Sequence, residues 1–240
     1  MKKAFFLLVL WVILVQLAGC NKRIRGSGHV IQQTLALDSF TAVEIEGSFD
    51  VAVQQKAIPS GILTMEAEDN IAPLINARVV NRALKIRYST IDQIQTKKTP
   101  KIFVNAAFLE RLYINGSGSI QTSGSWDANQ LELRVNGSGD IATSLQVRSL
   151  QIAVNGSGKI SLGGKAVTTD ANISGSGNIH AAGLISDKAK AMISGSGTIY
   201  CGRVDQELDG VISGSGKIYY SGNPPAVRTQ ISGNGQIIRQ

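Results

Sequence analysis

The sequence predicts an all-β fold, a single-stranded parallel β-helix (β-solenoid), and two observations lead to it. The first is a hexapeptide that recurs seven times with starts 21, 19, 19, 20, 19 and 19 residues apart. The copies are Asn115–Ile120, Asn136–Ile141, Asn155–Ile160, Ser174–Ile179, Ser194–Ile199, Ser213–Ile218 and Ser232–Ile237. The second is an apolar pattern with a spacing of two residues before each copy. A fixed period of this length is typical of stacked-repeat folds.

The apolar columns assign an inward face to each coil. The residue before every hexapeptide is β-branched and apolar: Ile114, Val135, Val154, Ile173, Ile193, Ile212 and Ile231. The residue two positions earlier is Leu112, Leu133, Ile152, Ala171, Ala191, Gly210 or Thr229. Apolar residues at a spacing of two indicate strands with one buried face. We therefore expect rungs of about 19–20 residues, stacked about 4.8 Å apart and right-handed.

The Gly-x-Gly segment within each hexapeptide predicts the corner of the coil. Glycine reaches positive φ without steric cost, so two glycines around a small residue permit a sharp bend. The first residue of the hexapeptide then stacks on its equivalent in the next rung. For Asn115, Asn136 and Asn155 this predicts a ladder of side-chain amide hydrogen bonds.

Residues 29–112 continue the β pattern in a less regular form. Val43–Ile45 and Val51–Val53 alternate around Gly47, which predicts an early, degenerate corner. Further strands are expected at 62–67, 79–88 and 102–104. One short helical turn is expected near 70–75, interrupted by Pro73.

The N-terminus carries an export signal. Lys2 and Lys3 precede an apolar stretch that is too short to cross a bilayer comfortably, as in a secretory signal peptide. Leu17-Ala18-Gly19-Cys20 resembles the bacterial lipobox, which implies acylation of Cys20 after cleavage. Asn21 favours the outer membrane of a Gram-negative bacterium, by resemblance to the sorting rule of enteric bacteria. The alternative is an uncleaved signal anchor with an unmodified Cys20.

These signals divide the chain into three parts: a signal peptide at 1–19, a lipidated tether at 20–28 and a β-helix domain at 29–240. Cleavage removes Lys2 and Lys3 and lowers the formal net charge from +7 to +5. This modest, dispersed excess and an aromatic content of 5% exclude a nucleic-acid surface of basic residues interleaved with aromatic ones. With Cys20 acylated, Cys201 has no disulfide partner and is expected to be a small packing residue.

The N-terminal strands and the corners together resemble a known family. Phe40–Val51, Glu66–Ile71, Leu84–Ile86 and the string of Asn/Ser-Gly-Ser-Gly corners resemble the putative auto-transporter adhesin head GIN domain, over roughly residues 36–238. The resemblance implies a β-helical body on an exported, often lipid-anchored bacterial protein. It supplies no catalytic residues.

No constellation for catalysis, metal or cofactor binding is found in the sequence. His29 and His180 have no Cys or His neighbour at metal-ligand spacing. The acidic residues of the repeats show no common column, whereas glycan-cleaving enzymes need paired carboxylates. These residues are Asp127, Asp140, Asp170, Asp187, Asp205, Glu207 and Asp209.

The sequence therefore predicts a non-enzymatic, membrane-anchored lipoprotein of the cell envelope with a binding or adhesion body. Its expected partners are the membrane, through Cys20, and an envelope glycan or a surface protein. The alternatives are a polysaccharide lyase or hydrolase, and a passive envelope scaffold or stress-related protein. Beyond the lipidation site at Cys20, the sequence assigns no ligand-binding residue.

Overall fold

The computed structural model describes residues 23–56, 61–90 and 92–240, and almost all of them lie in strands or tight turns. The strands of the N-terminal part are β1 (Arg23–Arg25), β2 (Val30–Ala36), β3 (Ala42–Gly47), β4 (Asp50–Gln55), β5 (Ile62–Glu68), β6 (Ile75–Val80), β7 (Ala83–Tyr88), β8 (Gln93–Gln95), β9 (Lys101–Ala106) and β10 (Arg111–Gly116). Those of the repeats are β11 (Ser119–Gly137), β12 (Asp140–Gly156), β13 (Lys159–Gly175), β14 (Asn178–Gly195), β15 (Thr198–Gly214), β16 (Lys217–Ser221), β17 (Ala226–Ser232) and β18 (Gln236–Arg239).

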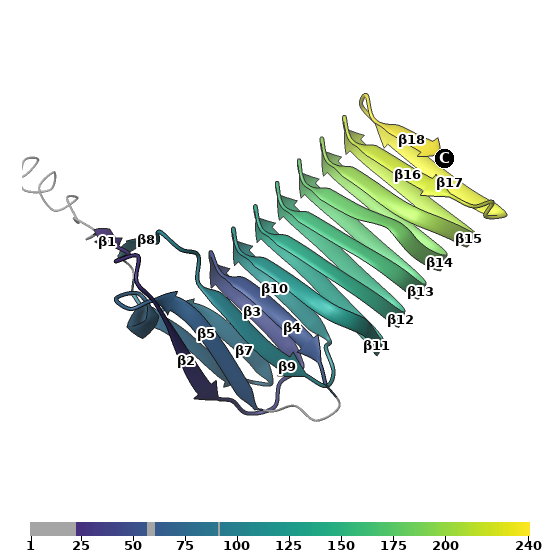
Figure 1. Cartoon of the computed structure of the whole chain (residues 1–240). Coiled ribbons are helices and arrows are strands. Elements are labelled where there is room, and N and C mark those ends of the chain that lie inside the picture. The colour runs from purple at the N-terminus through teal and green to yellow at the C-terminus, as the bar shows by residue number, and fades with distance from the viewer. Residues whose placement is uncertain (1–22, 57–60, 91) are drawn as a thin grey trace, which may run out of the picture.

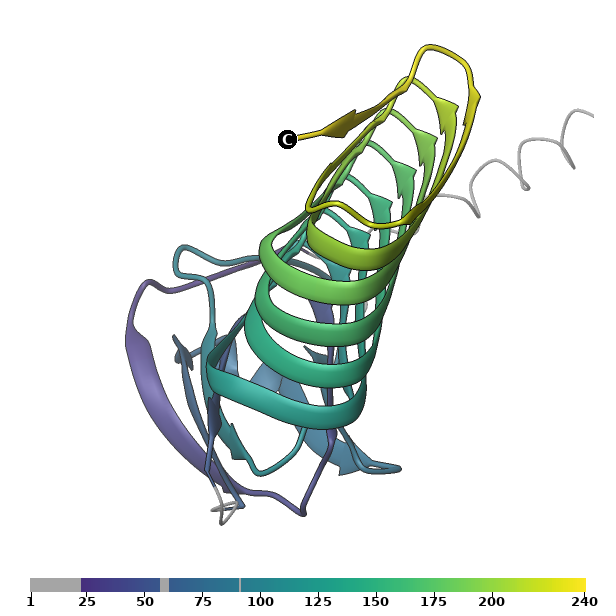
Figure 2. The same cartoon turned by 90° about the vertical axis from the view of Figure 1, so that its right-hand side faces the viewer.

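The repeats form the predicted β-solenoid. Each of the long strands β11 to β15 winds through one whole coil, and successive coils pair in parallel (Figure 1). Figure 2 shows the coils as loops of similar shape that follow one another along the stack. The order β18-β16-β15-β14-β13-β12-β11-β10-β3-β7-β6 runs through the main sheet. The hexapeptide period is therefore the rung of the coil.

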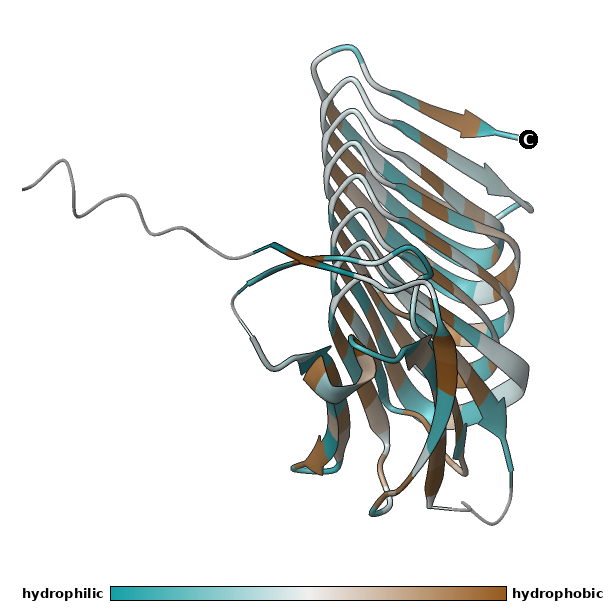
Figure 3. Cartoon of the chain, turned by 60° about the vertical axis from the view of Figure 1, so that its left-hand side comes forward, coloured by the Kyte–Doolittle hydropathy of each residue, from teal (hydrophilic) through white to brown (hydrophobic). Residues whose placement is uncertain are grey.

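The apolar columns form the core, as the sequence predicts. Ile114, Val135 and Val154 stack in register, and none of these side chains is exposed. Apolar residues recur at the same place in successive coils (Figure 3). The column also continues toward the N-terminus, where Ile114 pairs with Ile45 and Ile45 with Ile86. Parallel stacking thus begins two levels before the first hexapeptide.

The two glycines of each corner are needed for different reasons. The first has positive φ, as at Gly137 (+120°) and Gly156 (+125°). The second does not, but it approaches the coil beneath. A Cβ added to Gly158 would lie 2.5 Å from Val135 Cγ1 and 2.6 Å from the carbonyl oxygen of Gly139. Hydrogen bonds such as that from the Lys159 N–H to the Gly139 carbonyl (3.0 Å) carry the ladder through the corner.

Antiparallel strands cover the N-terminal end of the stack. β5 pairs antiparallel with β9 and β2, and β6 pairs antiparallel with β7. The expected strand at 79–88 is wrong: the chain reverses there in a hairpin. Asn81 (φ +52°) and Arg82 (φ +60°) form its two-residue turn, and positive φ at both positions is typical of a type I′ turn. The short helical turn is confirmed as a 3₁₀ helix, η1 (Ala72–Leu74), with Pro73 at its start.

The signal peptide and Cys20 lie outside the described residues. Within the described ranges, no helix has the length and apolar character needed to span a bilayer.

Candidate functional site

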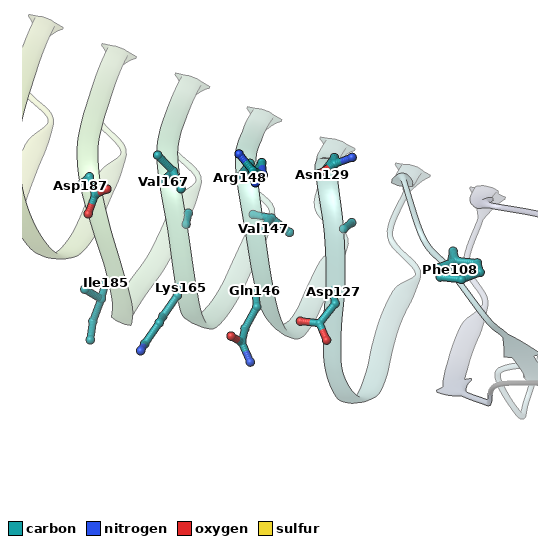
Figure 4. Close-up of a pocket in the computed structure, with 12 residues that line it drawn as sticks. Phe108, Asp127, Asn129, Gln146, Val147, Arg148, Lys165, Val167, Ile185 and Asp187 are labelled. Atoms are coloured by element: carbon teal, nitrogen blue, oxygen red, sulfur yellow. The ribbon is translucent and has the colours of Figure 1, made fainter.

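A groove runs along the solenoid axis across four successive coils and is lined by side chains of β11 to β14 (Figure 4). Its volume is about 680 Å³. One column of its wall is formed by Asp127, Gln146, Lys165 and Ile185, which pair in register on β11 to β14. The other column is formed by Asn129, Arg148, Val167 and Asp187, from the same strands. The groove is therefore built from equivalent positions of the repeat.

The floor of the groove is apolar and made of small side chains. Ala128, Val147 and Ala166 occupy the position between the two wall columns, and they pair in register. Val147 is 7% exposed and Ala166 is 6% exposed, so the floor belongs to the core. The side chains on either side of it extend in opposite directions (Figure 4). Long, mostly polar wall side chains, with Val167 and Ile185 among them, stand over a small apolar floor and produce the hollow.

Phe108 lies at the N-terminal end of the groove and is 65% exposed. It also lines a second hollow of about 590 Å³, together with Arg82, Glu110, Arg111 and Glu132. Asp127, Ala128 and Asn129 line both hollows. The two hollows therefore adjoin on either side of an exposed aromatic ring.

The charges of the groove balance. Arg148 and Lys165 supply two positive groups, and Asp127 and Asp187 supply two negative ones. In the described part of the chain, none of these four side chains forms an ion pair. They therefore remain available to a ligand. Asp127 and Asp187 lie three rungs apart, which is about 14 Å at the spacing of stacked strands.

A second polar face carries a column of alternating charges. Asp170, Lys190 and Asp209 pair in register, so the sequence-based expectation that no acidic residues share a column is wrong there. In the neighbouring column, Lys188 lies 3.2 Å from Glu207, and Arg228 also binds this carboxylate. Hydrogen bonds from Arg228 and Lys188 lower the pKa of Glu207. Each of these three carboxylates has a cation at a neighbouring register position, and among them Glu207 is the one with a recorded ion pair.

The remaining residues considered in the sequence are dispersed. His180 is exposed and packs edge-on against Tyr200, with ring centroids 5.0 Å apart. His29 lies 3.7 Å from Asp69 at the other end of the molecule. Cys201 is 4% exposed, which confirms it as a packing residue, and burial raises the pKa of its thiol to about 12. The described residues contain no cluster of three or more His, Cys, Asp or Glu that would hold a metal ion.

The groove is the feature that sequence reasoning missed. Its walls come from a segment between the inward columns, where Asp127, Gln146 and Lys165 look like unrelated surface residues. Their period of 19 residues was readable once the hexapeptides set the register.

The chain matches one family model and is similar in fold to several solved structures. The family described as "Putative auto-transporter adhesin, head GIN domain" matches residues 39–224. A "putative adhesin" from Bacteroides fragilis is 22% identical with a TM-score of 0.84, covering 90% of this chain and all of that one. A "putative lipid binding protein" from Parabacteroides distasonis is 26% identical with a TM-score of 0.74, covering 91% of this chain and all of that one. No curated protein matches the chain.

Proposed function

The chain belongs to the family described as "Putative auto-transporter adhesin, head GIN domain". From this premise we propose that it is a lipid-anchored, non-enzymatic binding protein of the bacterial envelope whose axial groove holds an extended, uncharged glycan. The adhesin-like description of the family supports a location at the bacterial surface or envelope. The anchor, the absence of catalysis and the ligand are the parts that we propose.

The observation that carries the proposal is the shape of the groove. The groove crosses four coils along the solenoid axis and is therefore elongated. An elongated groove suits a chain-like ligand. Equivalent side chains recur every rung, about 4.8 Å apart, which is close to the length of one pyranose residue in an extended chain. A repetitive wall of this kind matches a repetitive polymer.

The chemistry of the walls selects an uncharged polymer. Asn129, Gln146, Arg148 and Asp187 offer both donors and acceptors, as sugar hydroxyl groups require. Because the cations and carboxylates balance, neither a polyanion nor a polycation gains from the groove as a whole. Phe108 offers an exposed apolar ring on which the face of a sugar can pack.

Within the groove and in the column of Asp170 and Asp209, the spacing of the carboxylates argues for binding without cleavage. Glycoside hydrolysis uses two carboxyl groups about 5–9.5 Å apart. Asp127 and Asp187 are separated by about 14 Å, three rungs at the strand spacing. Asp170 and Asp209 lie two rungs apart, about 9.6 Å, which is the upper limit of this range, and Lys190 occupies the position between them.

A lipid ligand is the alternative suggested by the name of the Parabacteroides distasonis neighbour. The groove of this chain has an apolar floor, and its walls carry charged and amide groups at six of eight positions, with Val167 and Ile185 at the other two. An acyl chain would leave these wall groups without partners, which costs free energy when they lose water. The walls therefore favour a glycan.

Calorimetric titration tests the ligand. The protein is extracted in detergent and titrated with cellotetraose and chitotetraose as uncharged probes, and with tetragalacturonate as an anionic one. We expect the uncharged probes to bind, and Phe108→Ala to weaken binding about tenfold. Phe103→Ala removes another exposed ring, 42% exposed on a different face, and should leave binding unchanged. No binding of either uncharged probe at millimolar concentration, or equal loss in both variants, would overturn the assignment.

Mass spectrometry tests the anchor, and product analysis tests the absence of catalysis. An N-terminal mass that corresponds to acylated Cys20, and that disappears in Cys20→Ser, is expected. The tetrasaccharides should be recovered intact after prolonged incubation. Shortened products would favour the enzymatic alternative instead.

A further inference from the structure

The first described residues are held firmly against the body of the protein. β1 (Arg23–Arg25) pairs in parallel with β8 (Gln93–Gln95), and the Gly26 N–H donates to the Gln95 carbonyl at 2.9 Å. The Asn70 side chain donates to the Arg25 carbonyl at 2.8 Å and accepts from the Ser27 N–H at 2.9 Å. The described part of the expected tether, residues 23–28, is therefore part of the folded body.

The buried carboxylate of Glu68 stabilises the contact between the β1 segment and the β8 segment. Glu68 is fully buried at the end of β5, and it accepts hydrogen bonds from the Gly28 N–H at 2.6 Å and the Lys97 N–H at 3.0 Å. Gly26 lies against it so closely that a Cβ at this position would collide with the carboxylate. Charge-assisted bonds of this type are stronger than neutral ones, particularly where water is excluded. One side chain thus ties the segment before β2 to the segment after β8.

The short distance from Cys20 makes the position of this contact important. Three residue steps separate Cys20 from Arg23, and they span at most about 11 Å even when fully extended. If Cys20 carries acyl chains, β1 must lie within that reach of the headgroup layer. Figure 1 shows β1 and β8 at the N-terminal end of the stack, far from the last coil.

The exposed charges at this end suit a phospholipid surface. Arg23, Arg25, Lys97 and Lys98 are all exposed on β1 and in the segment that follows β8. The exposed or half-exposed carboxylates beside them are those of Asp69 and Asp92, and Asp69 is hydrogen-bonded by Ser27. The cations are in excess even when buried Glu68 is counted. Basic residues next to an anchor are attracted to anionic headgroups.

We propose that residues 23–25 and 93–98, here called the β1–β8 foot, rest on the headgroups of the membrane that holds the anchor, so that the C-terminal coils lie farther from it. This inference rests on the proposed lipid anchor at Cys20 and not on the proposed glycan. The anionic lipid headgroup is its ligand. The β1–β8 pairing and the hydrogen bonds of Glu68 leave only a short connection between the anchor and the folded body. The foot therefore fixes the orientation of the solenoid relative to the membrane.

A site-specific quenching experiment tests the foot. The acylated protein is reconstituted into vesicles of phosphatidylethanolamine and phosphatidylglycerol that contain a headgroup-labelled quencher lipid. A fluorophore is attached at Gln93→Cys in the foot or at Asn234→Cys in the last corner. Buried Cys201 does not compete for the label. We expect strong quenching at position 93 and at least fivefold weaker quenching at position 234.

Charge-removing variants supply the matched comparison. Arg23→Gln/Arg25→Gln/Lys98→Gln should reduce quenching at position 93 severalfold, whereas Lys159→Gln/Lys190→Gln/Lys217→Gln removes the same charge from exposed solenoid positions and should not. Replacing phosphatidylglycerol by phosphatidylcholine should have the same effect as the foot variant. Equal quenching at both positions, or equal effects of both triple variants, would overturn the foot. An unacylated Cys20 in the mass spectrum would instead overturn the anchor on which it rests.

Discussion

The side-chain amide of Asn136 donates a hydrogen bond of 2.7 Å to the amide oxygen of Asn115, the residue directly beneath it in the stack. Asn155 donates in the same way to Asn136 at 2.8 Å. This confirms the predicted amide ladder for the first three corners. Ser174 continues the column above Asn155.

Removing the middle amide should cost stability without disturbing the fold. Asn136→Ala deletes both bonds, but the freed groups of Asn115 and Asn155 regain water because the column is exposed. We therefore expect a loss of about 1 kcal/mol, or about 2–4 °C in the melting temperature. Asn178→Ala, at an exposed corner position outside the ladder, is the control and should change the melting temperature little.

The glycines of the structure differ sharply in whether a larger side chain fits at their position. Gly175 has φ +124°, and a Cβ there would lie 2.6 Å from the Gly156 carbonyl oxygen. Gly183 lacks positive φ, and its nearest neighbour would be 3.7 Å away. Gly175→Val should destabilise by about 3 kcal/mol or more, whereas Gly183→Ala should be neutral or slightly stabilising. Equal melting temperatures for the two variants would refute the corner geometry.

How much the sequence predicts depends on whether a residue belongs to a repeated column. Ile114, Val135 and Gly137 were assignable because each has six equivalents, and their roles follow from periodicity alone. The N-terminal hairpin was not predicted, since Asn81-Arg82 contains no glycine and interrupts an apolar stretch that reads as one strand. Phe108 was also missed. It follows β9 in a connection outside any repeat, and only the folded chain brings it beside Asp127.

The buried thiol of Cys201 provides a pH-dependent test of the packed core. Burial raises its pKa from 9.0 to about 12, so the folded state keeps the proton where the unfolded chain releases it. Stability should therefore fall as the pH rises from about 9 toward 12, because the unfolded state binds fewer protons over this range. Cys201→Ala should lose this part of the alkaline pH dependence of stability. Iodoacetamide at pH 8 should alkylate Cys201 only after denaturant is added, and rapid labelling of the native protein would contradict its burial.

The strained turn at Arg82 links stability to ligand binding. Its φ of +60° is unfavourable for a residue with a Cβ, and Arg82 lines the hollow on the N-terminal side of Phe108. Arg82→Gly should relieve the strain and stabilise the protein by up to about 1 kcal/mol. It also removes a guanidinium from the wall, so the affinity for the uncharged tetrasaccharides should fall.

The same turn provides its own control. Asn81→Gly relieves positive φ one position earlier, at a residue that does not line the hollow, and asparagine tolerates this conformation better than arginine. Its effect on melting temperature should be small and its effect on affinity absent. If Arg82→Gly stabilises the fold and leaves affinity unchanged, the second hollow is not part of the binding surface, and a bound glycan would extend from Phe108 only toward the C-terminal coils. If stability rises and affinity falls, the strained conformation of Arg82 is explained by the role of its side chain in the second hollow.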